Sequence, residues 1–381
     1  MQRDLFFLNF DSNDLIDFLS NQFLSFLSAS SAFPKKMINL NNALLSEKMK
    51  SVLLSRKVNP VSVNHAVDSL IQTSLRGVDS HGIHLYPHYC RAVDSGRINK
   101  NPNIEINKTA SATALINADH AFGHHAGAVA IDYACELALQ SGIAAVNVQN
   151  STHFGAAAYF ALRASNKNLI GFSFTNADAL VKAFASKQSF FGTNPICFTA
   201  PLANEEPFCL DLATSLVSWN KIKNYRKANK EIPSHWAFDK EGLPVTDPHK
   251  AASVNPAGEY KGFGLGMMVD ILCAVIGGGL IGKDILPMFD SPIEARRKIS
   301  HFFMAIDIDK FIPVDIFKTN LQSVVDRIRQ LPALNNQIVM VAGDPEKKSF
   351  QLRSVAGIPI EENIFDEFIA IDKDFQTVIM K

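Results

Sequence analysis

The sequence predicts an α/β fold, because apolar runs of strand length alternate with helical segments through the middle of the chain. Strand-like runs at 112–116 and 144–148 flank a helical stretch at 126–140. An alanine-rich helical stretch at 156–164 then leads to a third strand-like run at 169–175. The chain has 381 residues, of which 47% are hydrophobic, and this is enough to bury a large core in two lobes.

The elements on either side of this alternation are predicted from the same periodicities. Upstream, the apolar spacing between Leu40 and Leu75 is helical and is broken at Asn59-Pro60, which indicates a pair of helices. Downstream, we expect strands at 196–200, 208–212, 302–307 and 337–341, helices at 215–223, at 315–331 and from about Ile360, and a polar loop at 233–261.

Residues 1–36 differ in composition from the rest of the chain. They are rich in phenylalanine and serine, but Asp4, Asp11 and Asp14 interrupt the apolar stretch that a secretory signal needs. A new amphipathic pattern begins at Met37. We therefore expect 1–36 to be a loosely ordered extension, and we hypothesise that it is read from an upstream start site.

The bulk composition argues against several classes of protein. Lysine plus arginine and aspartate plus glutamate are equal at 37 each, so no net charge attracts nucleic acid or an anionic membrane. The five cysteines are scattered and form no Cys-x-x-Cys pair, which favours reduced thiols in the cytoplasm. The longest apolar run, 265–282, contains Asp270, and a carboxylate at a bilayer centre costs about 2.5–3.5 kcal/mol. We therefore expect a buried helix there and no membrane partner.

The segment Arg76-Gly77-Val78-Asp79-Ser80-His81-Gly82 is the strongest candidate for a site of chemistry. It follows an apolar helical stretch and holds a histidine between a serine and a glycine. Histidine exchanges protons near neutral pH, and glycine lets the backbone approach a ligand closely. The structural alternative is a capped helix end followed by a turn.

Three further polar segments stand where predicted strands begin or end, and open α/β sheets bind ligands at such places. His153 separates a strand from the alanine-rich helix. Gly192-Thr193-Asn194-Pro195 is a polar turn that leads into a strand, and Asp211-Leu212-Ala213-Thr214-Ser215 places an acid at a strand end. Ordinary helix caps and an ordinary tight turn are the structural alternatives.

The glycine-rich segment 262–266 is not a Rossmann fingerprint. It follows a loop instead of a strand, and no ribose-binding acid lies at the expected distance. Lys261-Gly262 at a helix start can nevertheless offer a cation and backbone N–H groups to a phosphate.

His120, His124 and His125 invite a metal-site interpretation. No carboxylate stands at ligand spacing from them, so we expect polar surface residues and no metal. A metal-dependent hydrolase is the weakest of the functional hypotheses.

The joint order of these motifs resembles the malate/L-lactate dehydrogenase family of non-Rossmann NAD(P)-dependent oxidoreductases. That family includes ureidoglycolate, sulfolactate and malate dehydrogenases, a diketogulonate reductase and a cyclic imine reductase. The resemblance covers residues 37–381. It is carried by Arg76-Gly-x-Asp-Ser-His-Gly, Tyr89, Ser151-x-His153-x-Gly155-Ala156, Gly192-Thr-Asn-Pro195, Asp211-Leu-Ala-Thr214, Lys261-Gly262, His301-Phe-Phe-x-x-Ile306-Asp307 and Gly343-x-Pro345-Glu346.

The resemblance implies an L-sulfolactate dehydrogenase-like architecture. A mixed-sheet NAD(P)-binding domain at 116–289 would be inserted into a helical, α+β substrate-side lobe formed by 37–115 and 290–381. The implied catalytic residues are Ser80, His81, His153 and Asp211. The implied cofactor-binding residues are His153, Phe154, Gly155, Ala156, Ala177, Asp211, Leu212, Ala213, Lys261, Gly262 and Gly343.

The sequence also departs from the family pattern. Three residues after Gly82, relatives often carry an arginine suited to a substrate carboxylate, and this chain has Leu85. Either another cation, Arg91 or Arg76, binds the acid, or the substrate is unusual.

The leading hypothesis is hydride transfer between NAD or NADP and a small 2-hydroxy/2-oxo acid of the malate, lactate or ureidoglycolate type. His81 would exchange the hydroxyl proton while Ser80 and Asp211 orient the charges. A cyclic imine reductase of the same family and a non-catalytic cofactor-binding relative are the alternatives. The resemblance also implies a homodimer.

Overall fold

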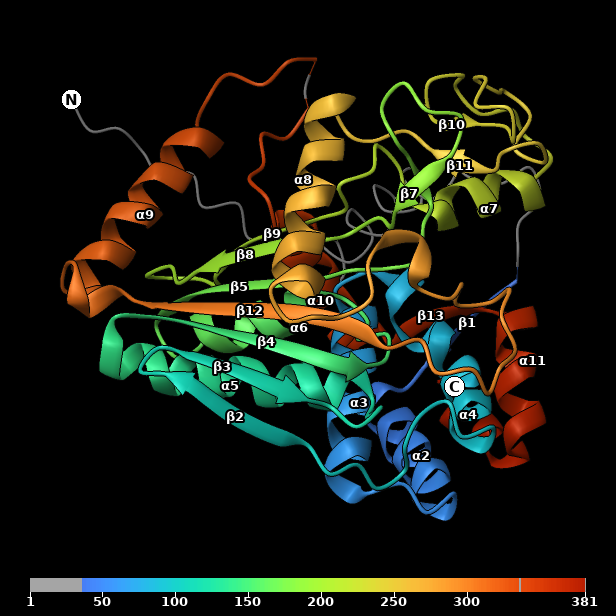
Figure 1. Ribbon diagram of the computed structural model, residues 1–381, viewed down its shortest axis with the longest axis horizontal. Helices are drawn as coiled ribbons and strands as arrows, with labels where there is room; N and C mark the ends of the chain where they lie inside the picture. Colours follow the sequence, from blue (N-terminus) through green and yellow to red (C-terminus); the bar gives the residue numbers. More distant parts are fainter. Residues whose placement is uncertain (1–35, 336, 381) are drawn as a thin grey trace, which may run out of the picture. The chain divides into compact units, whose positions relative to one another are not determined.

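The computed structural model describes residues 36–335 and 337–380, shown with its helices and strands in Figure 1. The expected extension at 1–36 lies outside the described residues, except for Lys36. The chain divides into units 1–37 and 38–381, and the second unit is described here. Its α-helices are α2 (Asn42–Ser55), α3 (Pro60–Leu75), α4 (Tyr86–Asp94), α5 (Gly123–Ser141), α6 (Ala158–Ser165), α7 (Trp219–Lys227), α8 (Tyr260–Asp270), α9 (Val314–Arg329), α10 (Asp344–Ala356) and α11 (Glu362–Ile371).

A mixed seven-stranded sheet forms the centre of the fold, which confirms the predicted mixed α/β class. Only its β3–β4 pair is parallel, and the other neighbours are antiparallel. Its strand order is β2 (Glu105–Ala110), β3 (Thr113–Asn117), β4 (Ile143–Ser151), β12 (Ile299–Asp307), β5 (Leu169–Thr175), β8 (Ile196–Ala200) and β9 (Phe208–Leu212).

The strand directions bring the predicted site segments to one edge of this sheet. Because β12 is antiparallel to both β4 and β5, the ends of β4 and β5 lie beside the start of β12. The antiparallel pairs β5–β8 and β8–β9 place the start of β8 and the end of β9 at the same edge. The segments around His153, Ala177, Asn194 and Asp211, far apart in sequence, therefore converge.

Helices cover both faces of the sheet. On one face, α5 and α6 pack through a core rich in alanine, whose small side chains allow close helix–sheet approach. On the other face, α8 and the π-helix Ile271–Val275 pack Val269 and Cys273 against Phe174 and Phe302. Figure 1 shows α8 crossing the sheet on the side opposite to α5.

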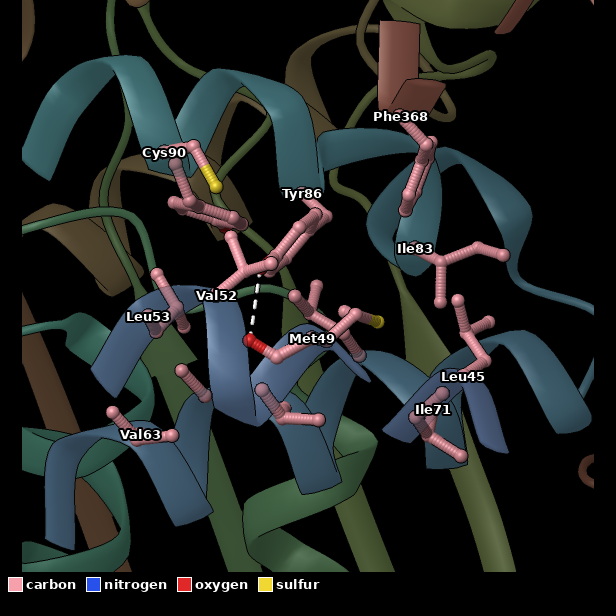
Figure 2. Close-up of a cluster of buried hydrophobic side chains, with 14 of the residues drawn as sticks. Leu45, Met49, Val52, Leu53, Val63, Ile71, Ile83, Tyr86, Cys90 and Phe368 are labelled. Atoms are coloured by element: carbon pink, nitrogen blue, oxygen red, sulfur yellow. Dashed lines mark hydrogen bonds between the residues drawn. The ribbon is translucent and has the colours of Figure 1, made fainter. Parts of the chain in front are cut away.

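A second hydrophobic core joins the N-terminal helices to the C-terminal segment. It contains residues of α2, α3 and α4 together with residues of β13 (Ile358–Glu361), α11 and the 3-10 helix Lys373–Val378. In Figure 2, Tyr86 stands between these helices, and its hydroxyl donates a hydrogen bond of 2.9 Å to the Met49 carbonyl. The Tyr86 ring also stacks on Phe368, with centroids 5.5 Å apart. Strand β1 (Met37–Leu40) pairs with β13.

A small four-stranded sheet and α7 form a third core. The strand order is β10 (Ala237–Phe238), β11 (Ser253–Val254), β6 (Val181–Lys182) and β7 (Ser189–Phe191). Ile222 of α7 is fully buried there beside Val254. The expected polar loop at 233–261 thus contains two short strands and the first residues of α8.

Two local predictions were wrong, and one helix was not predicted. Residues 337–341 are not a strand, since β-pairing for them is absent from the described part of the chain. The following helix α10 was missed because its start, Gly343-Asp344-Pro345, reads as a turn, although proline is well tolerated in the first turn of a helix. The run 265–282 is only partly buried, with Val275 and Ile276 58% and 66% exposed. None of the described helices has the length and apolarity needed to cross a membrane.

Candidate active site

A cleft of about 1010 Å³ opens at the edge of the sheet where the strand ends converge. Its walls come from the segment after α3, the start of α6, the ends of β5 and β9, and the start of α10. All four predicted catalytic residues line it, and so do most of the predicted cofactor residues. These are Ser80, His81, His153, Asp211, Gly155, Ala156, Ala177, Leu212, Ala213 and Gly343.

His81 lies on the cleft wall, in a one-turn 3-10 helix directly after α3. Its Nδ1 is 2.8 Å from the Ser80 hydroxyl, which can accept the proton of Nδ1–H or donate its own proton. When Ser80 accepts, Nε2 carries the lone pair that a general base needs. Desolvation lowers the pKa of His81, so the ring is neutral at pH 7.

His153 stands beside His81, with ring centroids 5.8 Å apart and an interplanar angle of 23°. Its Nδ1 lies 2.7 Å from the hydroxyl of Tyr89, a buried residue of α4. The pKa of His153 is well below its usual value, first because of desolvation and then because of the neighbouring His81 and Arg297. A hydroxyl lies at Nδ1 of each ring, but Nδ1 of His153 also accepts the backbone N–H of Gly155 at 3.4 Å, a second contact not found for His81 among the described residues.

A partly buried ion pair fixes the segment that carries His81. Arg353 of α10 donates to both carboxylate oxygens of Asp79, at 2.6 and 3.0 Å, and to the carbonyl of Ser74 at 2.6 Å. Such a two-pronged contact defines orientation as well as distance. Because α10 begins at the cleft and Asp79 precedes Ser80, this helix connects one cleft wall to the catalytic segment.

Asp211 lies across the cleft at the end of β9. Its carboxylate accepts a hydrogen bond of 2.8 Å from the backbone N–H of Ala158, in the first turn of α6. Acidic groups at a helix start stabilise it through the helix dipole. The carboxyl group is open to the cleft but surrounded by protein, and the resulting desolvation raises its pKa. Among the described residues, no histidine is bonded to Asp211, so its bonded role is that of a helix cap.

The remaining wall of the cleft leaves room for an extended cofactor with a flat ring. Small residues line it at 155–158, at Ala177 and at Ala213, so that a flat ring can lie against the backbone. Gly343, with φ +95°, packs against the Cys209 backbone at the start of α10, where a side chain would be strained. The first turn of α10, which also borders the cleft, carries the carboxylates of Asp344 and Glu346, as helix N-termini favour.

Three predicted cofactor residues do not line this cleft. The Phe154 ring is buried in the core, where it stacks on His301 with centroids 4.7 Å apart. Lys261 and Gly262 lie at the start of α8, outside the residues that line the cleft. A Cβ at Gly262 would come within 2.0 Å of the Ala257 carbonyl oxygen, so the packing of the preceding loop requires a glycine here.

The prediction that His120, His124 and His125 are surface residues was wrong. All three are buried, and His124 is completely so. Burial lowers the pKa of His124 to about 3. Within the described ranges, no group of three or more His, Cys, Asp or Glu side chains is arranged to hold a metal ion.

Sequence reasoning missed several residues of the site. Tyr89 belonged to the family pattern, but its bond to His153 required the packing of α4 against the end of β4. Asp79 was part of the motif, whereas its partner Arg353 is 274 positions away and carries no motif signal. Arg297, buried two residues before β12, also lines the cleft.

Comparison with known proteins agrees with this geometry. A family model described as malate/L-lactate dehydrogenase matches residues 41–368. The chain belongs to the malate/L-lactate dehydrogenase family. The resemblance inferred from the motifs is thereby confirmed.

Relatives within this family carry different substrate names. Malate dehydrogenase of Pyrococcus abyssi is 35% identical over 313 residues, covering 79% of this chain and 84% of the relative. Ureidoglycolate dehydrogenase (NAD(+)) of Escherichia coli O157:H7 is 32% identical over 303 residues, covering 79% and 86%. The solved sulfolactate dehydrogenase of Methanocaldococcus jannaschii superimposes with a TM-score of 0.83 at 30% identity, covering 89% of this chain and 98% of that chain. The expected sulfolactate dehydrogenase-like fold is confirmed.

Proposed function

We propose that this protein is an NAD(P)-dependent dehydrogenase that interconverts a small 2-hydroxy acid and the corresponding 2-oxo acid. The observation that carries the proposal is the pair His81 and His153, side by side on a cleft wall with Nδ1 of each ring held by a hydroxyl. Membership of a family of dehydrogenases supports it. When bound, the nicotinamide cofactor supplies or takes up the hydride.

The proton step belongs to the histidines. In the oxidation direction, neutral His81 accepts the hydroxyl proton at Nε2 while Ser80 holds Nδ1. In the reduction direction the same nitrogen returns the proton to the oxygen on C2. We assign His153, oriented by Tyr89, to the same cleft as the second residue able to exchange a proton. Such help contributes about 10²–10⁴-fold, and alignment of the substrate supplies much of the rest.

The other site residues are proposed to bind the cofactor. Those in the cleft are His153, Gly155, Ala156, Ala177, Asp211, Leu212, Ala213 and Gly343. Phe154, Lys261 and Gly262 would act through the backbone or from the start of α8. Relatives include a ureidoglycolate dehydrogenase named for NAD(+) and a sulfolactate dehydrogenase named for NADP(+), so both cofactors belong in the test.

We further propose a homodimer in the cytoplasm. The exposed apolar side of α8 and of the π-helix after it supports the dimer, because a large apolar surface is costly to leave in water. It comprises Leu265, Met267, Met268, Ile271, Val275 and Ile276. Five free cysteines support a reducing compartment.

We also propose 116–289 as the cofactor lobe, and 37–115 together with 290–381 as the substrate-side lobe. Strand β12 of the last segment lies between β4 and β5 in the central sheet.

A spectrophotometric screen tests the function. Oxidation of NADH and of NADPH is followed with a panel of 2-oxo acids and, for the alternative reaction, cyclic imines. Turnover of a 2-oxo acid at rates typical of enzymes, about 1–10³ s⁻¹, is expected. Turnover of imines alone would support the reductase alternative. Tight NADH binding without turnover of any compound would indicate a non-catalytic relative.

A further inference from the structure

The cleft has no cation at position 85, although a 2-oxo acid brings a carboxylate into it. Leu85 lines the cleft and cannot bind this group. Of the two arginines proposed from the sequence, Arg91 lies outside the cleft, and Arg76 lies on its wall with Nη2 bonded to a carboxylate. Arg91 is exposed outside the cleft and pairs with Glu367 at 3.2 Å, while Arg76 pairs with Glu206 at 2.6 Å.

Arg297 stands at the sheet edge, close in strand register to the segment that carries His153. It precedes β12 by two residues, and β12 pairs Ile299 with Ser151 of β4, two residues before His153. On its other side, β12 pairs with β5, whose end leads to Ala177 and Asp178. The strand register therefore places Arg297 between the segments that carry His153 and Asp178.

The guanidinium of Arg297 has donors left for a ligand. Nε donates to the Leu286 carbonyl at 2.7 Å, and Nη2 donates to the Asp178 carboxylate. An arginine has five N–H donors, so the two on Nη1 and the second one on Nη2 remain. In the described part of the chain, no acceptor is bound to Nη1. The side chain is only 4% exposed, so its fixed fork faces a partly desolvated site.

Other cations that line the cleft are engaged differently. The guanidinium of Arg226 donates to the carbonyls of Pro248 and Ala251. Lys347 binds Glu205 at 2.7 Å. Lys223 places Nζ 4.4 Å from the centroid of the Phe289 ring, and among the described residues the guanidinium of Arg76 is bonded only through Nη2, so these two cations compete with Arg297.

We propose that Arg297 binds the carboxylate of the 2-oxo acid through Nη1 and Nη2 and thereby selects acids over uncharged ketones. Asp178 balances the buried charge while the cleft holds no substrate, and Leu286 fixes the plane of the guanidinium. This inference rests on the proposed function, because it names the group that recognises that substrate. Because the strand register sets Arg297 next to the segment of His153, a carboxylate held there keeps C2 on the side of that histidine.

The test compares a 2-oxo acid, the best one from the screen, with its neutral amide. In Arg297→Met, kcat/KM for the acid should fall on the order of 100-fold, mainly through KM, because a charge-assisted pair is lost. The kcat/KM of Arg297→Met for the amide should stay within about threefold of the wild-type value. Arg297→Lys keeps the charge without the fork and should recover only part of the loss. Added guanidinium ion should partly restore acid turnover in Arg297→Ala.

Matched variants keep the test decisive. Arg297→Met leaves the Asp178 carboxylate without its partner, and this variant can therefore fold poorly. The double variant Arg297→Met/Asp178→Asn removes that carboxylate and should show the same selective loss of kcat/KM for the acid. Arg91→Met, outside the cleft, should leave both substrates unaffected. Equal losses for acid and amide, or loss of acid preference in Lys223→Met or Arg76→Met instead, would overturn the proposal. If the wild type turns over no 2-oxo acid at all, it is the proposed function that fails.

Discussion

Two pairs of histidines in this protein differ in what surrounds their rings. His81 and His153 line the cleft, and each has Nδ1 next to a hydroxyl. His124 and His301 are completely buried behind them. The side chain is the same, so the chemistry that it can perform is decided by whether one ring nitrogen remains open to a ligand.

The two buried histidines, His124 and His301, differ in the hydrogen bonding of their ring nitrogens. His301 has both nitrogens bonded, to the hydroxyls of Thr175 and Ser151 at 2.8 Å each. His124 has neither nitrogen bonded to any described residue, and its ring lies edge-on to Tyr89 at 5.0 Å. We infer that His301 contributes to stability, that His124 fills space, and that only the cleft pair serves chemistry.

The largest effect is expected from His81→Ala. Loss of the proton-exchanging group should lower kcat about 10²–10⁴-fold, while the dissociation constant for NADH changes only a few-fold. Stopped-flow turnover and fluorescence titration measure the two quantities. His235→Ala, at an exposed position, is the matched control. Unchanged turnover in His81→Ala would remove this histidine from the mechanism.

His301→Leu should act on stability instead. It leaves the hydroxyls of Ser151 and Thr175 without their shared partner in the core. The free energy of unfolding should fall by about 2–4 kcal/mol, while kcat of the folded fraction stays near wild type. Urea denaturation followed by fluorescence measures the free energy of unfolding. A loss of kcat without a loss of stability would make His301 a functional residue.

Tyr89→Phe tests how the second cleft histidine is held. The change removes one hydroxyl and the 2.7 Å contact to Nδ1 of His153, with little change in packing. We expect kcat/KM to fall about tenfold, since one hydrogen bond contributes about 1 kcal/mol or slightly more. His301→Leu should not show this loss. Full activity of Tyr89→Phe would mean that Tyr89 has no part in orienting His153.

The smallest effect concerns pH. Burial lowers the pKa of His124 and of His301 to about 3, so the unfolded chain binds more protons than the folded one below pH 6.5. Stability is therefore complete above about pH 6.5 and is lost as pH falls toward the folded-state values. When the pH is lowered from 7 to 5.5, the free energy of unfolding of His124→Leu should fall by about 1 kcal/mol less than that of the wild type. Parallel pH profiles of the two proteins would contradict a buried neutral His124.

The sequence predicted the two cleft histidines better than it predicted His124 and His125 of α5, for a physical reason. Ser80-His81 and His153 belong to short local motifs at element ends, so their neighbours in sequence are also their neighbours in space. His124 and His125 looked like surface residues because nothing local reveals that α5 turns them into the packing against α3 and β4. The same limit applies to Arg353 and Arg297, whose partners come from distant segments.

The sequence by itself determined the alternation of strands and helices, the absence of a Rossmann fingerprint and the residues able to exchange protons. Periodicity and local motifs carry this information because they depend on a few adjacent residues. The tertiary structure alone decided which of those residues meet. The antiparallel placement of β12 between β4 and β5 brings His153, Ala177 and Arg297 to one edge, and that pairing is a contact between segments more than 100 residues apart.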